Sequence, residues 1–307
     1  MASCLKSLQL TKAIVLSCAV YAMAGVQLSC GGSARVQTPP TVDQPTFSHV
    51  VLLVEENHSY SAVVGNPSMP YFNSLVSQYG LATQYFADAH PSIPNYLMLT
   101  TGRTETFDND FSGTISDDNV VRELVKAGKT WKCYAESLPA PGYLGSDTGL
   151  YVRRHDPFTY LSDVQNDKAQ AANIIPFTQF ATDIENNALP QYSFIEPNLI
   201  SDAHDGSLAQ ADAWLQANIA PLLANPAFVE SGLLIVTFDE GDQADVDHVG
   251  GHIATLIISS KAKKGYQSKT LYQHQSALRL VLAGSGVNNF PGLAATAPDM
   301  TEFFTGH

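Results

Sequence analysis

"HVVLLVE", residues His49–Glu55, is a continuous apolar run rich in β-branched side chains. Such a run is typical of a strand that is buried on both faces, as in a parallel sheet covered by helices. Further strands are predicted for QYSFIE, GLLIVTFDE and HIATLIISS at residues 191–196, 232–240 and 252–260, and for shorter runs at 81–87 and 130–135. The chain is therefore expected to build its core on a sheet of buried strands.

Segments with apolar residues at helical spacing lie between these runs, at residues 69–80, 117–128, 207–223 and 274–284. Gly80, as a C′ residue, and Gly128 are predicted to end the first two helices. This alternation predicts an α/β fold with a mostly parallel central sheet and helices on both faces. The less regular stretch from residue 139 to residue 180 is expected to form loops or a cap over one edge of the sheet.

The N-terminus has the pattern of an export signal, because Lys6 and Lys12 precede an apolar run that is too short to predict a membrane span. QLSCGGSA, which contains Cys30, resembles a bacterial lipoprotein box, although Gln27 stands where that box has an aliphatic residue. Ordinary cleavage near Ala34 is the alternative. We therefore predict a signal peptide at 1–30, a Pro-rich spacer at 31–46 and one domain at 47–307. The product is expected to be periplasmic, extracellular or a membrane-anchored lipoprotein.

The chain has 307 residues and a formal net charge of −13 at pH 7. This acidity argues against binding to nucleic acid or to anionic membranes through charge, so contact with a membrane is expected only through a lipid on Cys30. A negatively charged substrate is compatible with it, because a bound metal inverts the charge of one pocket. Cys133 is the only cysteine after the predicted signal, so the domain must rely on its core rather than on internal disulfides.

Polar residues follow several predicted strands, where open α/β sheets bind their ligands. Glu56 and Asn57 follow the first strand, and Asp239 and Glu240 end the strand GLLIVTF. Adjacent carboxylates repel each other unless a divalent cation lies between them. Further oxygen and imidazole groups come from two other segments, EPNLISDAHDG and DHVGGH: Asn198, Asp202, His204, His248 and His252. These groups predict a site centred on one or two divalent metal ions of open identity.

Ser92 stands between two prolines in HPSIPNYLMLTTG, residues 90–102. Pro91 and Pro94 fix their own φ angles, so Ser92 is expected on a rigid turn just before a helix at Asn95–Thr101. Backbone N–H groups at such a helix start favour an anion. The alternative interpretation is a Pro-rich connection in which the serine is an N-cap.

Four motifs in order, VVLLVEENHSY, HPSIPNYLMLTTG, EPNLISDAHDG and VTFDEGD with DHVGGHIATLIIS, together resemble the bacterial phosphoesterase family. That family contains acid phosphatases and phospholipase C-type enzymes and belongs to the alkaline phosphatase superfamily. The resemblance implies an alkaline phosphatase-like fold for residues 47–307 and Ser92 as nucleophile. It also implies that the metal ligands are Glu56, Asn57, Asp239 and Glu240 together with Ser92.

The chain departs from two-metal relatives, which have Asp-His in place of Asp239–Glu240 and Asp-x-x-x-His where Asn198 and Asp202 fall. A second metal therefore stays open. Three histidines are candidates to replace the missing ligands, to donate protons or to contact phosphate: His204, His248 and His252. The family segment YVRRHDPF makes Arg154 and His155 candidates for binding phosphate oxygens, with a solvated basic loop as the alternative. Asn109 is a further candidate by analogy with a pyrophosphatase asparagine.

The leading hypothesis is an exported, metal-dependent phosphomonoesterase, acid phosphatase-like, that acts on a small phosphorylated substrate through a phosphoserine. A phosphodiesterase or phospholipase C-type enzyme is the alternative within the same class. A non-catalytic surface lipoprotein is the alternative from another class. A serine carboxylesterase is not supported, because no serine lies in a G-x-S-x-G elbow.

Overall fold

The computed structural model describes residues 45–306 of the chain. The predicted signal peptide, the lipidation site Cys30 and nearly all of the predicted spacer lie outside these residues. Within residues 45–306, no helix is both long and apolar enough to span a membrane.

The described residues contain an eight-stranded sheet with the order β4-β3-β5-β1-β6-β7-β2-β8. The strands are β1 (His49–Glu55), β2 (Gly80–Phe86), β3 (Trp131–Ala135), β4 (Ile174–Pro176), β5 (Tyr192–Glu196), β6 (Gly232–Phe238), β7 (His252–Ile258) and β8 (Gln267–Ser268). Strand β7 runs antiparallel to its neighbours β6 and β2, and the other pairings are parallel. The predicted mostly parallel sheet is confirmed, and β1 lies near its centre.

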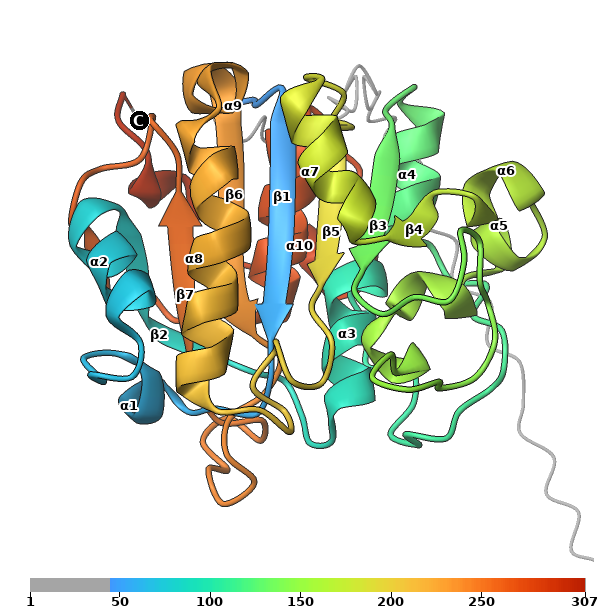
Figure 1. Ribbon diagram of the computed structural model, residues 1–307, viewed down its shortest axis with the longest axis horizontal. Coiled ribbons are helices and arrows are strands. Elements are labelled where there is room, and N and C mark those ends of the chain that lie inside the picture. Colours follow the sequence, from blue (N-terminus) through green and yellow to red (C-terminus); the bar gives the residue numbers. More distant parts are fainter. Residues whose placement is uncertain (1–44, 307) are drawn as a thin grey trace, which may run out of the picture. The chain divides into compact units, whose positions relative to one another are not determined.

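Helices cover both faces of this sheet, as predicted. Figure 1 shows α7 and α8 in front of the sheet and α3, α4 and α10 behind it. The helices are α1 (Tyr60–Val63), α2 (Pro70–Gln78), α3 (Ser92–Thr101), α4 (Val120–Lys126), α5 (Ser162–Gln165), α6 (Lys168–Ala171), α7 (Thr178–Glu185), α8 (Leu208–Ala224), α9 (Pro226–Ser231) and α10 (His274–Gly284). Short 3₁₀ turns occur at Arg153–His155, Pro157–Tyr160, Gly292–Ala295 and Thr301–Phe303.

Two strands were not predicted from the sequence, because they are too short to show a periodicity. Strands β4 and β8 have three and two residues and lie at the two edges of the sheet. Strand β4 falls in the stretch that was expected to form only loops or a cap. It pairs with β3, with Ile174 as the partner of Cys133, and forms one edge of the sheet.

Gly80 lies at the predicted C′ position of α2, directly after the C-cap Tyr79. Gly80 begins strand β2 and has no left-handed backbone, unlike Gly128, whose φ is 68°. A Cβ atom at Gly80 would lie 2.5 Å from Cδ1 of Phe303. Close packing of this ring, rather than a left-handed backbone at the helix end, therefore requires the glycine.

Asp212 of α8 holds the first turn of α2. Its carboxylate accepts the backbone N–H groups of Tyr71 at 2.9 Å and Phe72 at 2.8 Å, and only 3% of the residue is exposed. Because Asp212→Ala leaves both donors without a partner, we expect it to lower the free energy of unfolding by about 2–3 kcal/mol. Denaturant unfolding measures this, with the exposed Glu230→Ala expected to stay within about 0.5 kcal/mol of wild type.

Candidate active site

Acidic side chains meet at the C-terminal ends of β1 and β6, at the lower edge of the sheet in Figure 1. Glu56 follows β1, Asp239 and Glu240 follow β6, and none of the three is more than 5% exposed. Because β1 and β6 pair in register along their whole length, the residues that follow them lie side by side. The backbone N–H of Asn57 accordingly donates to Asp239 Oδ1 at 3.1 Å. The structure thus brings these four predicted ligands together.

Ser92 faces the carboxylates from the start of α3. Its Oγ atom lies 3.3 Å from Glu240 Oε1 and 3.5 Å from Glu56 Oε2. Helix α3 begins at Ser92, three residues earlier than predicted, and its N-cap is Pro91. The alternative interpretation of Ser92 as a capping serine is therefore wrong, because its hydroxyl points to carboxylates and not to the backbone.

Two side chains fix the turn before α3. Asn95 accepts the backbone N–H of Ala89 at 3.1 Å and donates to the carbonyl oxygen of the same residue at 2.8 Å. His90 Nδ1 lies 2.7 Å from Glu240 Oε2, so this histidine also orients the carboxylate nearest to Ser92. The serine hydroxyl is consequently held in one place, which favours attack on a bound substrate.

Among the described residues, no lysine or arginine forms an ion pair with a carboxylate of this cluster. Burial, followed by repulsion from Asp239 and Asp202, raises the pKa of Glu56 well above its usual value. Burial together with Glu240 raises the pKa of Asp239 to about 7, and burial raises that of Glu240 to about 7. Burial also raises the pKa of Asp202, whose carbonyl oxygen accepts the N–H of Glu56 at 2.8 Å, to about 8. A cation at this point would remove the repulsion.

The donor set fits a divalent cation. The buried oxygens Asp239 Oδ2 and Asp202 Oδ2 have no hydrogen-bond partner in the described part of the chain. Both ring nitrogens of His155 face carboxylates, Glu56 Oε1 at 3.2 Å and Asp202 Oδ2 at 3.5 Å, without forming a hydrogen bond. Ligand atoms of Glu56, His155 and His204 all lie within 4.8 Å of one another. Burial lowers the pKa of His155 well below its usual value, so its ring is neutral, the form that binds metals.

A cavity of about 360 Å³ opens beside Ser92. Its lining consists of Asn57, Pro91, Ser92, Asn109, Arg154, His204, Glu240, Asp242 and Gln243. The Arg154 side chain is only 19% exposed, and its Nε atom is buried without a partner among the described residues, so the alternative of a solvated basic loop does not describe it. The cavity thus offers both a cationic group and a hydroxyl to one ligand.

Three predicted residues do not line the cavity beside Ser92. The Asn198 Oδ1 atom accepts backbone N–H groups of the following turn at 3.0 and 3.2 Å. His252 stacks on Tyr60 with ring centroids 4.4 Å apart, and the exposed His248 packs on Phe86 at 4.1 Å. Their local contacts account for these side chains without a ligand.

The sequence interpretation missed three supporting residues. The Tyr96 hydroxyl donates to Glu56 Oε1 at 2.5 Å, and its ring stacks on His155 with centroids 5.1 Å apart. His90 contacts Glu240, and His274 Nε2 lies 2.6 Å from the carbonyl oxygen of Asp239. Helical spacing was an available signal for Tyr96, because it lies four residues after Ser92 and shares its face of α3.

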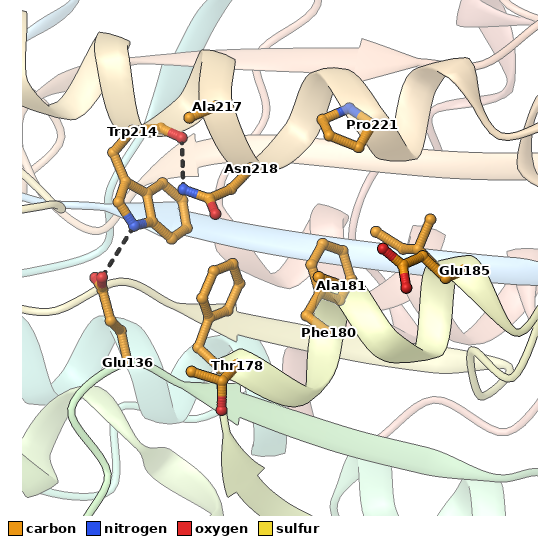
Figure 2. Close-up of a pocket in the computed structure, with 11 residues that line it drawn as sticks. Glu136, Thr178, Phe180, Ala181, Glu185, Trp214, Ala217, Asn218 and Pro221 are labelled. Atoms are coloured by element: carbon orange, nitrogen blue, oxygen red, sulfur yellow. Dashed lines mark hydrogen bonds between the residues drawn. The ribbon is translucent and has the colours of Figure 1, made fainter.

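A second cavity, of about 430 Å³, lies between α7 and α8 and is shown in Figure 2. Its lining consists of Glu136, Phe177, Thr178, Phe180, Ala181, Ile184, Glu185, Trp214, Ala217, Asn218 and Pro221. None of the predicted site residues is among them. Glu136 accepts the Nε1–H of Trp214 at 3.1 Å, drawn as a dashed line between these two residues in Figure 2, and the backbone N–H of Asn198 at 3.0 Å. This cavity is therefore distinct from the one beside Ser92.

The chain is similar in sequence to known proteins over most of its length. Residues 66–288 match the model of the Phosphoesterase family. The chain is 36% identical over 264 residues to the phosphatidylinositol-3-phosphatase of Mycobacterium tuberculosis, covering 85% of this chain and 84% of that protein. It is 33% identical over 251 residues to a probable acid phosphatase of Kluyveromyces lactis, covering 79% of this chain and 59% of the yeast protein. The chain thus spans about three fifths of the length of the yeast relative.

Solved structures with the same fold are more distant in sequence. A protein of the alkaline phosphatase superfamily from Vibrio parahaemolyticus aligns with a TM-score of 0.56 at 14% identity, covering 80% of this chain and 68% of that one. Murine ectonucleotide pyrophosphatase/phosphodiesterase 5, as an inactive variant in complex with AMP, aligns with a TM-score of 0.57 at 11% identity, covering 84% and 100%. These alignments confirm the alkaline phosphatase-like fold.

Proposed function

Because this chain belongs to the Phosphoesterase family, we propose that it is a phosphoric ester hydrolase of the acid phosphatase type, exported and metal-dependent, which cleaves phosphomonoesters through a phosphoserine at Ser92. One observation carries the proposal. A buried serine hydroxyl lies within 3.5 Å of two carboxylates, in the wall of a cavity that also presents an arginine. Export rests on the N-terminal sequence alone.

Ser92 is the proposed nucleophile. Its Oγ attacks phosphorus while the bond from phosphorus to the ester oxygen breaks, and the alcohol leaves with a proton. Water then attacks the phosphoserine, which releases inorganic phosphate and restores the hydroxyl. The hydroxyl hydrogen of Ser92 is directed at Glu240 and Glu56, so a lone pair of Oγ is free to face the cavity.

Arg154 and Asn109 line the cavity and are the proposed contacts for the phosphate oxygens. A guanidinium presents several N–H donors in a geometry that suits phosphate. His204 is the one predicted histidine of its set that lines the same cavity, and its Nδ1 atom lies 2.8 Å from Asp205 Oδ1. With Nδ1 held in this way, Nε2 is the atom we assign to protonating the leaving alcohol.

Two groups of residues are available to hold cations. The first is Glu56, Asn57, Asp239 and Glu240 together with Ser92, and the second adds Asp202 and His155. A divalent cation bound there would lower the pKa of the serine hydroxyl and neutralise charge on the phosphate. The oxygen-rich first group favours a hard or intermediate ion.

The assay that tests the function compares a phosphomonoester with a phosphodiester. We expect p-nitrophenyl phosphate to be hydrolysed faster than bis-p-nitrophenyl phosphate, because the relatives with 33% and 36% identity are named as phosphatases. Dialysis against a strong chelator should lower the rate by about 10²-fold or more, and one particular divalent ion should restore it. Phosphatidylinositol 3-phosphate belongs in the panel because one relative is named for that substrate.

Each alternative has its own outcome in this assay. Undiminished hydrolysis by protein shown to be metal-free by elemental analysis would contradict metal dependence. Faster cleavage of the diester, or of phosphatidylcholine, would favour the phospholipase C-type alternative. No hydrolysis of any ester, with every divalent ion tried, would favour a non-catalytic surface lipoprotein.

A further inference from the structure

A cysteine and two carboxylic acid side chains lie close together in the core, outside the cluster around Ser92. Cys133 lies on β3, Glu196 ends β5, and Asp156 follows the 3₁₀ turn at Arg153–His155. Each of the three is at most 2% exposed. One ligand atom from each, the thiol sulfur and two carboxylate oxygens, lies within 4.8 Å of the other two.

The carboxylates of this cluster are incompletely satisfied. Asp156 Oδ2 accepts the hydroxyl of Tyr151 at 3.2 Å, but Asp156 Oδ1 and Glu196 Oε2 have no hydrogen-bond donor in the described part of the chain. The adjacent cation, Arg153, places its guanidinium over the ring of Tyr160 at 4.5 Å from the centroid. Unpaired buried polar groups are unfavourable, so two such carboxylates beside a buried thiol point to a missing positive partner.

We propose that Cys133, Asp156 and Glu196 form a buried binding site for Zn²⁺, separate from the phosphate site. A cysteine sulfur favours thiophilic ions such as Zn²⁺, whereas Mg²⁺ and Ca²⁺ take oxygen ligands only. Tetrahedral ligands at ~2.0–2.3 Å from zinc lie about 3.3–3.8 Å apart, which is compatible with three atoms already within 4.8 Å of one another. Binding converts the thiol and both carboxyl groups to their anionic forms and releases the protons they carry.

The site would tie the active-site turn to the sheet. Asp156 comes directly after Arg154 and His155, whereas Cys133 and Glu196 belong to the neighbouring strands β3 and β5. An ion shared by the three would fix this turn relative to the strands. We assign the ion a structural role, because all of its ligands are buried and none of them lines the cavity beside Ser92.

Cobalt substitution tests the proposal directly. The full chain is purified without metal, reconstituted with Co²⁺ in degassed buffer and compared with a Cys133→Ser variant. We expect wild type to show a sulfur-to-cobalt charge-transfer band in the near ultraviolet, and Cys133→Ser to lack it. The difference spectrum removes any signal from Cys4, Cys18 and Cys30. Elemental analysis after zinc loading should find about one equivalent more Zn²⁺ in wild type than in the variant.

Two further variants separate this site from the phosphate site. Asp239→Asn should keep the charge-transfer band, because Asp239 belongs to the other cluster. Glu196→Gln preserves side-chain size and should weaken zinc binding about 10-fold or more, which decides the matter if Cys133→Ser fails to fold. Folded, cobalt-loaded wild type without the band would overturn the proposal. So would a band that persists unchanged in Cys133→Ser, or a zinc affinity that is unchanged in Glu196→Gln.

Discussion

Replacement of Ser92 by alanine should lower the turnover of a phosphomonoester by about 10³-fold or more, which corresponds to roughly 4 kcal/mol in the activation barrier. The physical reason is that Ser92 Oγ, which lies between Glu240 and Glu56, is the proposed nucleophile, so alanine removes the atom that would bond to phosphorus. The fold should survive, because Ser92 caps no backbone group and alanine is a good helix former at the start of α3. Turnover numbers and thermal melts of the same preparation measure both effects.

A conservative variant and a matched control sharpen this prediction. Ser92→Thr keeps a hydroxyl and should retain part of the rate, despite an added methyl group at a position that is 4% exposed. Ser285→Ala also removes a buried hydroxyl, one that donates to Val281 at 2.8 Å, and should lower stability by about 1 kcal/mol with unchanged turnover. A folded Ser92→Ala protein with near-normal turnover would refute the nucleophile assignment.

Asp239→Asn should abolish most of the activity for a different reason, the loss of bound metal. The substitution keeps the shape of a fully buried side chain and removes one negative charge from the cluster around Ser92. We expect metal affinity to fall at least about 10²-fold and kcat to fall with it. Metal titration followed by calorimetry measures the first quantity, and turnover at saturating substrate measures the second.

The stability of metal-free Asp239→Asn should not fall with its activity. Burial and the neighbouring Glu240 raise the pKa of Asp239 to about 7, which shows that its negative charge is unfavourable in the metal-free protein. Metal-free Asp239→Asn should therefore melt no lower than metal-free wild type, whereas added metal should raise the melting temperature of wild type only. Asp242→Asn is the control, because Asp242 lines the same cavity and its side chain is 52% exposed. Equal metal-induced stabilisation of wild type and Asp239→Asn would contradict the ligand assignment.

The sequence was sufficient where a local pattern dictates structure. The run His49–Glu55 became strand β1 with the predicted ends, because an apolar β-branched segment of this length is stable only when buried on both faces. The edge strands β4 and β8 could not be predicted, since two or three residues have no periodicity of their own and their pairing depends on the neighbouring strand. The earlier start of α3 also depended on context, because its first turn is buried.

The candidate ligands Glu56, Asn57, Asp239 and Glu240 could be named from the sequence, because polar residues that directly follow buried strands are a local feature, and the resemblance to the phosphoesterase family singled out Ser92. Their meeting at one point was decided by the register of β1 with β6, which joins segments about 180 residues apart. The tertiary structure also placed His204 and Arg154, but not His248 and His252, in the lining of the cavity. The physical reason is that the sequence gives the chemical identity of each side chain, whereas the distance between side chains remote in sequence is set by how the chain folds and packs. The same reason applies to Cys133, Asp156 and Glu196, three unremarkable positions in the sequence that only the pairing of β3 with β5 and the adjoining turn bring together.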